Sequence, residues 1–208
     1  MSEERLLIDS SHELGIPLSA AAAMRLLQLL DELLHWNRAY SLTSIDKREE
    51  MLTRHLLDSL SVAPFLQGRC IADAGTGAGF PGLPLAIACP ELSFKLIDSN
   101  QKKISFVNHA VRALELHNVE AVHARVEALS PTILPADTIV ARAFAPLGRL
   151  LERIAPLAGA STRVLAMKAQ LSDAELASVG ATWRVDAVHR VSVPGLDEAR
   201  CIVAVRHR

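Results

Sequence analysis

The chain has 208 residues, of which 50% are hydrophobic and 22% charged, and its formal net charge is −1. This length suits one domain with its own core, and the composition excludes a disordered chain. A net charge this close to zero gives no global attraction to nucleic acid. The charge is unevenly distributed, because the first 50 residues carry nine acidic and five basic side chains and the remaining residues are therefore slightly basic. Apolar runs fall far short of the roughly 20 residues that span a bilayer, so we expect no membrane partner.

The N-terminal residues and the cysteines indicate a compartment. The first seven residues, MSEERLL, are acidic and lack the basic start and apolar stretch of a secretory signal. Cys70, Cys89 and Cys201 are scattered without CxxC spacing, which argues against a zinc site and a disulfide framework. We therefore expect a cytoplasmic protein that binds no metal.

Helices are predicted for the first third of the chain. Ser19 can cap a helix over residues 19–38, whose leucines form a wide apolar stripe. A second helix is predicted over residues 48–63, because its apolar residues broadly face one side and Pro64 follows it. No strand pattern precedes residue 70. Residues 1–66 are therefore predicted to form a helical lobe packed on the core of a domain that covers residues 67–208.

From Cys70 onward, short apolar runs alternate with amphipathic helices, as is typical of βαβ units. The predicted strands cover residues 70–74, 93–98, 119–124, 138–141 and 163–167, and the predicted helices cover residues 82–89, 100–116 and 147–154. Ser172 and Glu175 have the spacing of a capping box that begins another helix. The last two strands, residues 183–193 and 199–206, have no helix between them and should form an antiparallel hairpin. The expected fold is a doubly wound α/β sheet, closed at one edge by this hairpin.

A glycine-rich segment, residues 71–82 (IADAGTGAGFPG), follows the first predicted strand and begins a helix. In a doubly wound sheet, a nucleotide-like ligand meets the carboxyl ends of the strands at this position. Gly75, Gly77 and Gly79 let the backbone turn sharply and approach a ligand closely. The spacing of Gly77, Gly79 and Gly82 also matches the G-x-G-x-x-G pattern, so a dinucleotide-binding protein is an alternative.

Two aspartates favour a different ligand. Asp73 lies at the tip of the first strand, where its charge would repel a pyrophosphate but would suit an ammonium group, such as that of the methionine part of S-adenosylmethionine. Asp98 ends the second strand, where a carboxylate can accept hydrogen bonds from both ribose hydroxyls of adenosine, or can cap the next helix. These residues predict an S-adenosylmethionine-dependent methyltransferase.

Motifs along nearly the whole chain resemble those of the bacterial small-subunit ribosomal RNA guanine-N7 methyltransferases, the glucose-inhibited division protein B family. The most specific are Arg-His-x-x-Asp-Ser at residues 54–59 and the glycine loop with its Gly-Phe-Pro-Gly ending. Further matches lie at residues 36–43 (WNRAYSLT), 96–99 (LIDS), 124–127 (ARVE), 141–144 (ARAF) and 167–170 (MKAQ). Ser41 stands where the family usually has Asn, and Ala169 where it usually has Gly.

The resemblance implies a seven-stranded, Rossmann-like methyltransferase sheet with S-adenosylmethionine as the methyl donor. It implies an enzyme of rRNA processing that methylates N7 of guanine 527 in 16S rRNA, with the rRNA or the small ribosomal subunit as its partner, and we expect a monomer. The cofactor contacts that the resemblance implies are Gly75, Phe80, Val126, Glu127 and Arg142. On the grounds given above, Asp73, Gly77 and Asp98 join them.

Methylation of guanine N7 requires no general base, because N7 carries an in-plane lone pair and no proton. We therefore expect catalysis by in-line positioning of N7, the methyl carbon and the sulfonium sulfur. Arg142 and Lys168, which follow the fourth and fifth predicted strands, are the expected catalytic residues. A cation close to N7 would oppose the positive charge that forms there, so basic side chains should contact phosphates or the O6 edge.

RNA recognition is expected at an unpaired base, because the major groove of A-form RNA is closed to side chains. The candidate RNA contacts are Arg54, His55, Arg125 and Lys168. For Arg54 and His55, which share a helix with Asp58, an internal salt bridge is the alternative, and for Phe80 the alternative to a cofactor contact is core packing. A methyltransferase that acts on another RNA or on a small molecule would use the same glycine loop. An enclosed acceptor pocket would favour the small molecule, and an open basic mouth would favour RNA.

Overall fold

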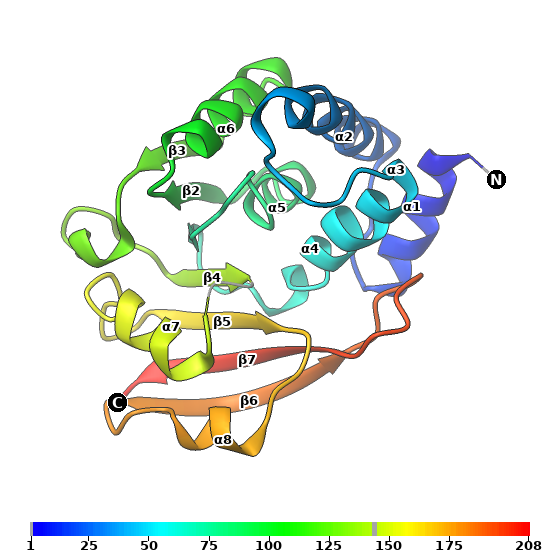
Figure 1. The fold of residues 1–208 in the computed structure, drawn as a ribbon. Coiled ribbons are helices and arrows are strands. Elements are labelled where there is room, and N and C mark those ends of the chain that lie inside the picture. Colours follow the sequence, from blue (N-terminus) through cyan, green and yellow to red (C-terminus); the bar gives the residue numbers. More distant parts are fainter. Residues whose placement is uncertain (1, 143–144) are drawn as a thin grey trace.

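The computed structural model describes residues 2–142 and 145–208; Met1, and Ala143 and Phe144 at the end of the ARAF motif, lie outside the described residues. In the described part, seven strands form one sheet in the order β3-β2-β1-β4-β5-β7-β6 (Figure 1). The strands are β1 (Cys70–Ala74), β2 (Ser93–Asp98), β3 (Val119–His123), β4 (Thr138–Arg142), β5 (Arg163–Lys168), β6 (Trp183–Val191) and β7 (Arg200–His207). Each predicted strand is confirmed to within two residues at either end.

The strand order places a ligand-binding position between β1 and β4. The first five strands are parallel, and the chain crosses from β3 at one edge back to β4, which lies beside β1. Doubly wound sheets bind their ligands where the strand order reverses in this way. β7 pairs antiparallel with both β5 and β6, so the predicted hairpin is confirmed and β6 forms the outer edge.

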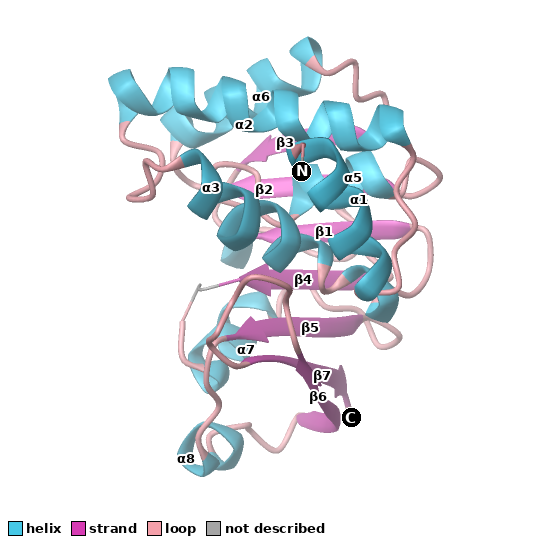
Figure 2. Cartoon of the chain, turned by 90° about the vertical axis from the view of Figure 1, so that its right-hand side faces the viewer, coloured by secondary structure: helices cyan, strands magenta, loops and turns pink. Residues whose placement is uncertain are grey.

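Helices cover both faces of the sheet (Figure 1, Figure 2). Successive strand residues point to opposite faces, and in β1 Ile71 joins one buried cluster while Ala72 joins the other. One face is covered by α1 (Glu3–Glu13), α2 (Ala20–Tyr40), α5 (Gly82–Ala88) and α6 (Gln101–Ala113), and the other by α7 (Leu147–Ile154). Two short helices, η3 (Val126–Ala128) and α8 (Asp173–Ala177), complete the doubly wound α/β fold.

The helices before β1 share one hydrophobic core with the sheet. As predicted, Ser19 caps α2, and its hydroxyl accepts a hydrogen bond from the Ala22 amide at 3.1 Å. The sequence pattern does not predict α1, because Leu7 is its one buried hydrophobic residue and no apolar stripe forms. In the described part of the chain, no helix is both long enough and apolar enough to cross a bilayer.

The segment predicted as one helix over residues 48–63 is helical, but the prediction of a single regular α-helix is wrong. The segment consists of α3 (Arg48–Met51), a π-helical turn η1 (Leu52–Leu57), α4 (Asp58–Leu60) and a 3₁₀ turn η2 (Ala63–Phe65). Single π-helical turns within helices often mark functional sites. Here the π turn and the residue after it place His55 and Asp58 in buried positions.

Candidate functional site

The glycine-rich loop leaves β1 at the position where the strand order reverses. The amides of Gly75 and Thr76 both donate to the carbonyl of Ile97 in β2, each at 2.9 Å. Gly75 and Gly77 have φ angles of 72° and 61°, in the left-handed region that favours glycine. A Cβ added at Gly77 would meet nothing closer than the Lys103 Nζ at 3.9 Å, so the loop leaves open space on this side.

Asp73 holds this loop from beneath. Its Oδ2 accepts hydrogen bonds from the Thr76 hydroxyl at 2.6 Å and from the Gly82 amide at 2.8 Å. The carboxylate is 1% exposed, and its Oδ1 has no hydrogen-bond partner among the described residues. Burial raises the pKa of Asp73 to about 6, although both hydrogen bonds act in the opposite direction. The carboxylate therefore holds Thr76 and Gly82, and the structure does not present it to a ligand ammonium group as predicted.

A cavity of about 130 Å³ lies on one side of the loop and is called here the Asp98 cavity. Asp98 Oδ2 accepts from the Gly77 amide at 2.9 Å, and Oδ1 accepts from the Asn100 amide at 2.8 Å. Each carboxylate oxygen can accept a further hydrogen bond. Asn100, rather than Asp98, caps α6 with its side chain, which corrects the capping alternative. The lining residues are Gly75, Asp98, Ser99, Ala124, Arg125, Val126, Glu127 and Arg153.

A second cavity of about 220 Å³, the Thr76 cavity, lies on the other side of the loop and shares Gly75 with the first. Phe80 is 4% exposed, so the core-packing alternative is confirmed, and the residue also forms part of the wall of this cavity. Its contact with a cofactor stays a prediction. The ring stacks on His55 with centroids 4.8 Å apart, and the Arg142 guanidinium carbon lies 5.8 Å from its centroid. The lining residues are Leu42, Thr43, His55, Gly75, Thr76, Gly77, Ala78, Phe80, Lys103 and Arg142.

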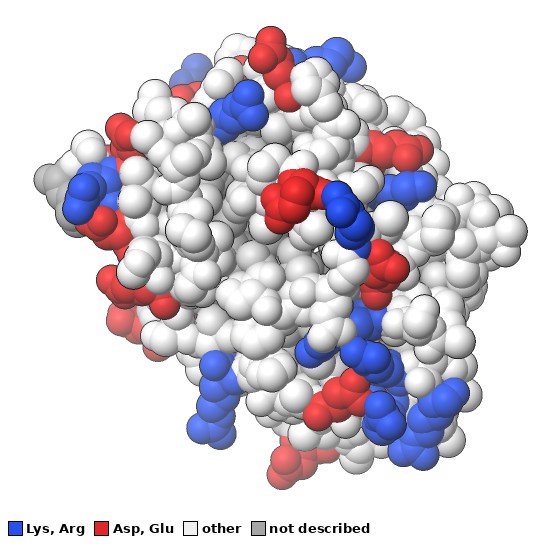
Figure 3. Space-filling view, turned by 180° about the vertical axis from the view of Figure 1, so that it is seen from behind, with Lys and Arg blue, Asp and Glu red and all other residues white. Residues whose placement is uncertain are grey.

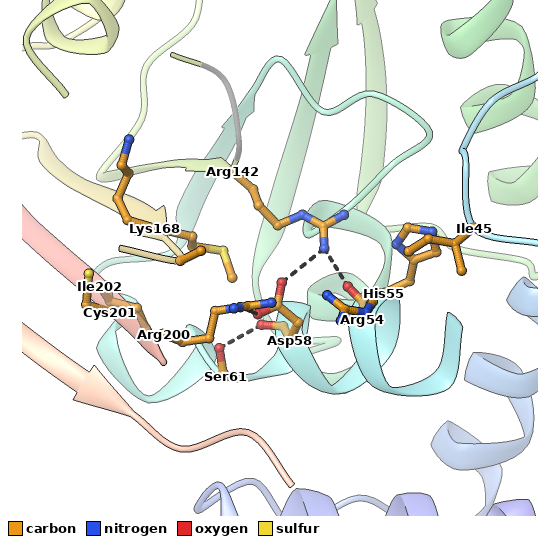
Figure 4. A pocket seen from close by; sticks show the side chains of 12 residues that line it. Ile45, Arg54, His55, Asp58, Ser61, Arg142, Lys168, Arg200, Cys201 and Ile202 are labelled. Carbon is orange, nitrogen blue, oxygen red and sulfur yellow. Dashed lines mark hydrogen bonds and ion pairs between the residues drawn. The ribbon is translucent and has the colours of Figure 1, made fainter. Parts of the chain in front are cut away.

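A third cavity of about 380 Å³, the Asp58 cavity, shares His55 and Arg142 with the second (Figure 4). The three cavities therefore form a row along the carboxyl ends of the strands, since Asp98, Arg142 and Lys168 are the last residues of β2, β4 and β5. The lining residues are Ile45, Arg54, His55, Asp58, Ser61, Arg142, Met167, Lys168, Ala169, Arg200, Cys201 and Ile202.

Asp58 connects three elements that are distant in sequence. Arg142 from β4 and Arg200 from β7 both point toward its carboxylate, at 3.3 and 2.9 Å (Figure 4). Asp58 is 7% exposed, so these ion pairs are shielded from water. The motif that contains Asp58 is visible in the sequence, but its pairing with Arg200 is not, because the two residues are 142 positions apart and no local pattern links them.

Arg54 forms internal ion pairs, but not with the nearby Asp58. Its guanidinium binds Glu198 at 2.6 Å and Glu50 at 3.0 Å, and its carbonyl accepts a hydrogen bond from Arg142 at 2.9 Å. The side chain is 34% exposed and lines the Asp58 cavity. The salt-bridge alternative is thus confirmed for Arg54, with different partners from the one expected.

His55 is a buried, neutral residue. Its Nε2 lies 3.0 Å from the Thr43 hydroxyl, and its Nδ1 has no hydrogen-bond partner among the described residues. Burial, together with the charge of Arg142, lowers the pKa of His55 to about 4. The predicted contact of His55 with an RNA phosphate does not fit this geometry, because the ring is uncharged at neutral pH and is 8% exposed.

The remaining basic candidates lie at different cavities. Lys168 lines the Asp58 cavity, where its Nζ pairs with Glu175 at 2.7 Å and donates to the Ala145 carbonyl at 3.2 Å. Ser172 caps α8 as predicted, but the Glu175 carboxylate binds Lys168 instead of completing the capping box. Arg125 is exposed and lines the Asp98 cavity but not the Asp58 cavity.

Charges on the back of the molecule do not single out a nucleic-acid surface. Lys and Arg side chains gather toward the lower right of this face, with Asp and Glu side chains among them (Figure 3). The described residues also hold no group of three or more His, Cys, Asp or Glu that could bind a metal ion.

Comparisons with known proteins identify the family. The family model described as rRNA small subunit methyltransferase G (GidB) matches residues 22–203. A "Ribosomal RNA small subunit methyltransferase G" from Stutzerimonas stutzeri is 44% identical over 202 residues, which cover 96% of this chain and 94% of that protein. The protein of the same description from Pseudomonas syringae is 41% identical over 196 residues, 94% of this chain and 91% of that protein.

Solved structures share the fold at low sequence identity. A SAM-dependent methyltransferase from Aquifex aeolicus has a TM-score of 0.57 and 19% identity, over 80% of this chain and 97% of that one. The mitomycin 7-O-methyltransferase MmcR has a TM-score of 0.59 and 16% identity, over 88% of this chain and 67% of that one. These likenesses show a methyltransferase-type sheet.

Proposed function

Because this chain belongs to the rRNA small subunit methyltransferase G family, we propose that it methylates N7 of guanine 527 in the 16S rRNA of the small ribosomal subunit. The family and the fold make it an S-adenosylmethionine-dependent transferase. One observation carries the proposal: the three cavities adjoin one another, since the first two share Gly75 and the last two share His55 and Arg142. This arrangement suits a cofactor in the first two cavities and an acceptor base in the third.

The residues around the glycine loop fit the cofactor. Asp98 keeps acceptor capacity on both oxygens for the ribose hydroxyls, and Val126 and Glu127 line the same cavity on the adenosine side. The open space at Gly77 would receive the methionine part in the Thr76 cavity. When bound, S-adenosylmethionine supplies a methyl group activated by its sulfonium. Asp73 acts here as a positioning residue, because it holds Thr76 and Gly82 in place.

The Asp58 cavity fits a flipped-out purine. Its volume of about 380 Å³ lies in the range of small-molecule sites, and its apolar wall includes Ile45, Met167 and Ile202. Arg142 and Lys168 project from the ends of β4 and β5 and are held by Asp58 and Glu175. Side chains held in this way can orient a base for in-line attack by the N7 lone pair. No proton has to be removed, so the neutral His55 needs no role as a base.

Basic residues favour RNA over a small neutral acceptor. Arg54, Arg142, Lys168 and Arg200 all line the Asp58 cavity. Each is paired with a carboxylate, but guanidinium and ammonium groups have further donors for the phosphates that flank a target nucleotide. Their contacts with RNA, and that of Arg125, belong to the proposal.

We also propose how the chain is organised. Residues 1–66 form a helical lobe that is packed on residues 67–208 and completes the site, since Thr43, His55 and Asp58 line the cavities. We propose that the chain acts as a monomer, because the proposed site calls for no residue from a second copy. An enzyme of rRNA works where ribosomal subunits are assembled, which supports a cytoplasmic location.

The test uses purified protein, labelled S-adenosylmethionine and small ribosomal subunits from cells that lack this modification. Labelled N7-methylguanine is then mapped by chemical cleavage. We expect a single labelled guanine, at position 527. If neither subunits nor naked rRNA become labelled while S-adenosylmethionine still binds, the acceptor is another RNA or a small molecule, and the proposal is refuted.

A further inference from the structure

We infer that Asp58 allows an arginine-rich acceptor cavity to hold a base that becomes positively charged. This inference rests on the proposed function, because it concerns the charge that N7 methylation creates. Asp58 is assigned as a positioning residue: it holds Arg142 and offsets its charge at the boundary between the cofactor and acceptor cavities.

The composition of the cavity wall poses the electrostatic problem. Four basic residues line the Asp58 cavity, and Asp58 is the one acidic residue among the described residues that do so. The wall by itself would therefore repel a cation. Unless carboxylates balance these cations, an N7-methylated guanine meets this repulsion and a neutral guanine does not.

Methyl transfer moves one positive charge from the Thr76 cavity into the Asp58 cavity. The N7 lone pair forms the new bond to the methyl carbon, and the electron pair of the broken carbon–sulfur bond stays on sulfur. The sulfonium thereby becomes a neutral thioether and the base becomes a cation. Asp58 lines the cavity that gains the charge and not the one that loses it. Its carboxylate therefore favours transfer over the reverse reaction.

Other carboxylates balance the remaining cations of the wall from outside it. Glu198 pairs with Arg54 at 2.6 Å and with Arg200 at 3.3 Å, and Glu175 pairs with Lys168 at 2.7 Å. Arg142, which lies at the boundary itself, has Asp58 as its acidic partner at 3.3 Å. The imidazole ring of His55, which stacks on Phe80, adds no charge at neutral pH. Loss of the Asp58 charge would thus leave Arg142 uncompensated beside the reacting base.

A purely structural role for Asp58 makes a different prediction. Asp58 also ties α4 to β4 and β7, so its loss could disturb the whole cavity. Such a disturbance would weaken the binding of a methylated and of an unmethylated base equally. A charge effect weakens the binding of the methylated base alone.

The experiment compares two RNA hairpins that carry the target loop with guanine or with N7-methylguanine at the target position. Binding is measured with S-adenosylhomocysteine present, so that the cofactor cavities are filled. For the wild-type protein we expect the two dissociation constants to agree within about threefold, since the Asp58 charge offsets that of Arg142. For Asp58→Asn we expect affinity for the methylated hairpin to fall selectively, by at least about tenfold.

Glu198→Gln is the matched control, because it removes a carboxylate from the same ion-pair cluster but outside the cavity wall. It leaves Arg142 paired with Asp58, so its selective loss of affinity for the methylated hairpin should be smaller than that of Asp58→Asn. The double variant Asp58→Asn/Arg200→Gln removes one charge of each sign and should recover part of the affinity for the methylated hairpin. Thermal unfolding and circular dichroism verify that each variant folds.

An Asp58→Asn protein that folds but loses affinity for both hairpins equally, or for neither, overturns the inference. If this variant does not fold, the wild-type comparison still decides: a wild-type preference for the unmethylated hairpin above about tenfold overturns it. Wild-type protein that fails to methylate ribosomal subunits would refute the proposed function instead, so the two failures are distinguishable.

Discussion

In the Asp98→Ala variant, the amides of Gly77 and Asn100 lose the carboxylate oxygens that accept their hydrogen bonds at 2.9 and 2.8 Å. The proposed bonds to the ribose hydroxyls are lost as well. Hydrogen bonds to a charged acceptor contribute about 1.5–3 kcal/mol each, and less where water competes, as it does at this partly exposed residue. We therefore expect S-adenosylmethionine binding to weaken by about 1–3 kcal/mol, or about 5- to 150-fold in Kd, measured by calorimetry.

Asp137→Ala is the control for loop geometry. The Asp137 carboxylate also accepts two backbone hydrogen bonds, from Arg69 at 2.8 Å and Cys70 at 2.9 Å, but at the opposite end of β1 and away from the three cavities. This variant should lose stability without losing cofactor affinity. An Asp98→Ala protein that binds S-adenosylmethionine like the wild type would refute the ribose contact. Equal losses of affinity in both variants would assign the effect to folding.

Three further predictions concern other parts of the chain. Burial raises the pKa of Asp73 in the folded state to about 6, above its unfolded value, so the stability that protonated Asp73 contributes is present below about pH 4 and is lost as the pH rises to about 6. Asp73→Asn should abolish this loss. In urea unfolding, the free energy of unfolding of the variant should exceed that of the wild type by up to about 3 kcal/mol between pH 4 and pH 7. Ser41 ends α2 with φ 50° and ψ 54°, so Ser41→Asn should stabilise the protein by about 0.5 kcal/mol, because Asn tolerates the left-handed region better; an unchanged or lower Tm would contradict this. Arg142→Ala should lower the single-turnover rate of methyl transfer by about 100-fold or more while the protein remains folded by circular dichroism, and wild-type activity would place Arg142 outside the site.

The strands and the glycine loop could be predicted because their signals are local. Side-chain alternation and the turn chemistry around Gly75 depend on neighbouring residues, so β1 and β2 have the predicted boundaries. Parallel strands place their carboxyl ends at one edge, which was enough to bring Asp98, Arg142 and Lys168 to the same side. The π-helical turn at Leu52–Leu57 was not predictable in the same way, because its extra residue is compatible with the same apolar pattern.

The sequence by itself thus determined the class of sheet, the edge that binds the cofactor and, through its motifs, the family. Only the tertiary structure decided that Asp58 lies between Arg142 and Arg200, that His55 is neutral, and that Asp73 faces the loop instead of a cavity. Charge pairing and desolvation depend on distances through space between elements far apart in the chain. Backbone periodicity carries no information about these distances, so the electrostatics of the acceptor cavity emerge only when the helices before β1 pack against β4 and β7.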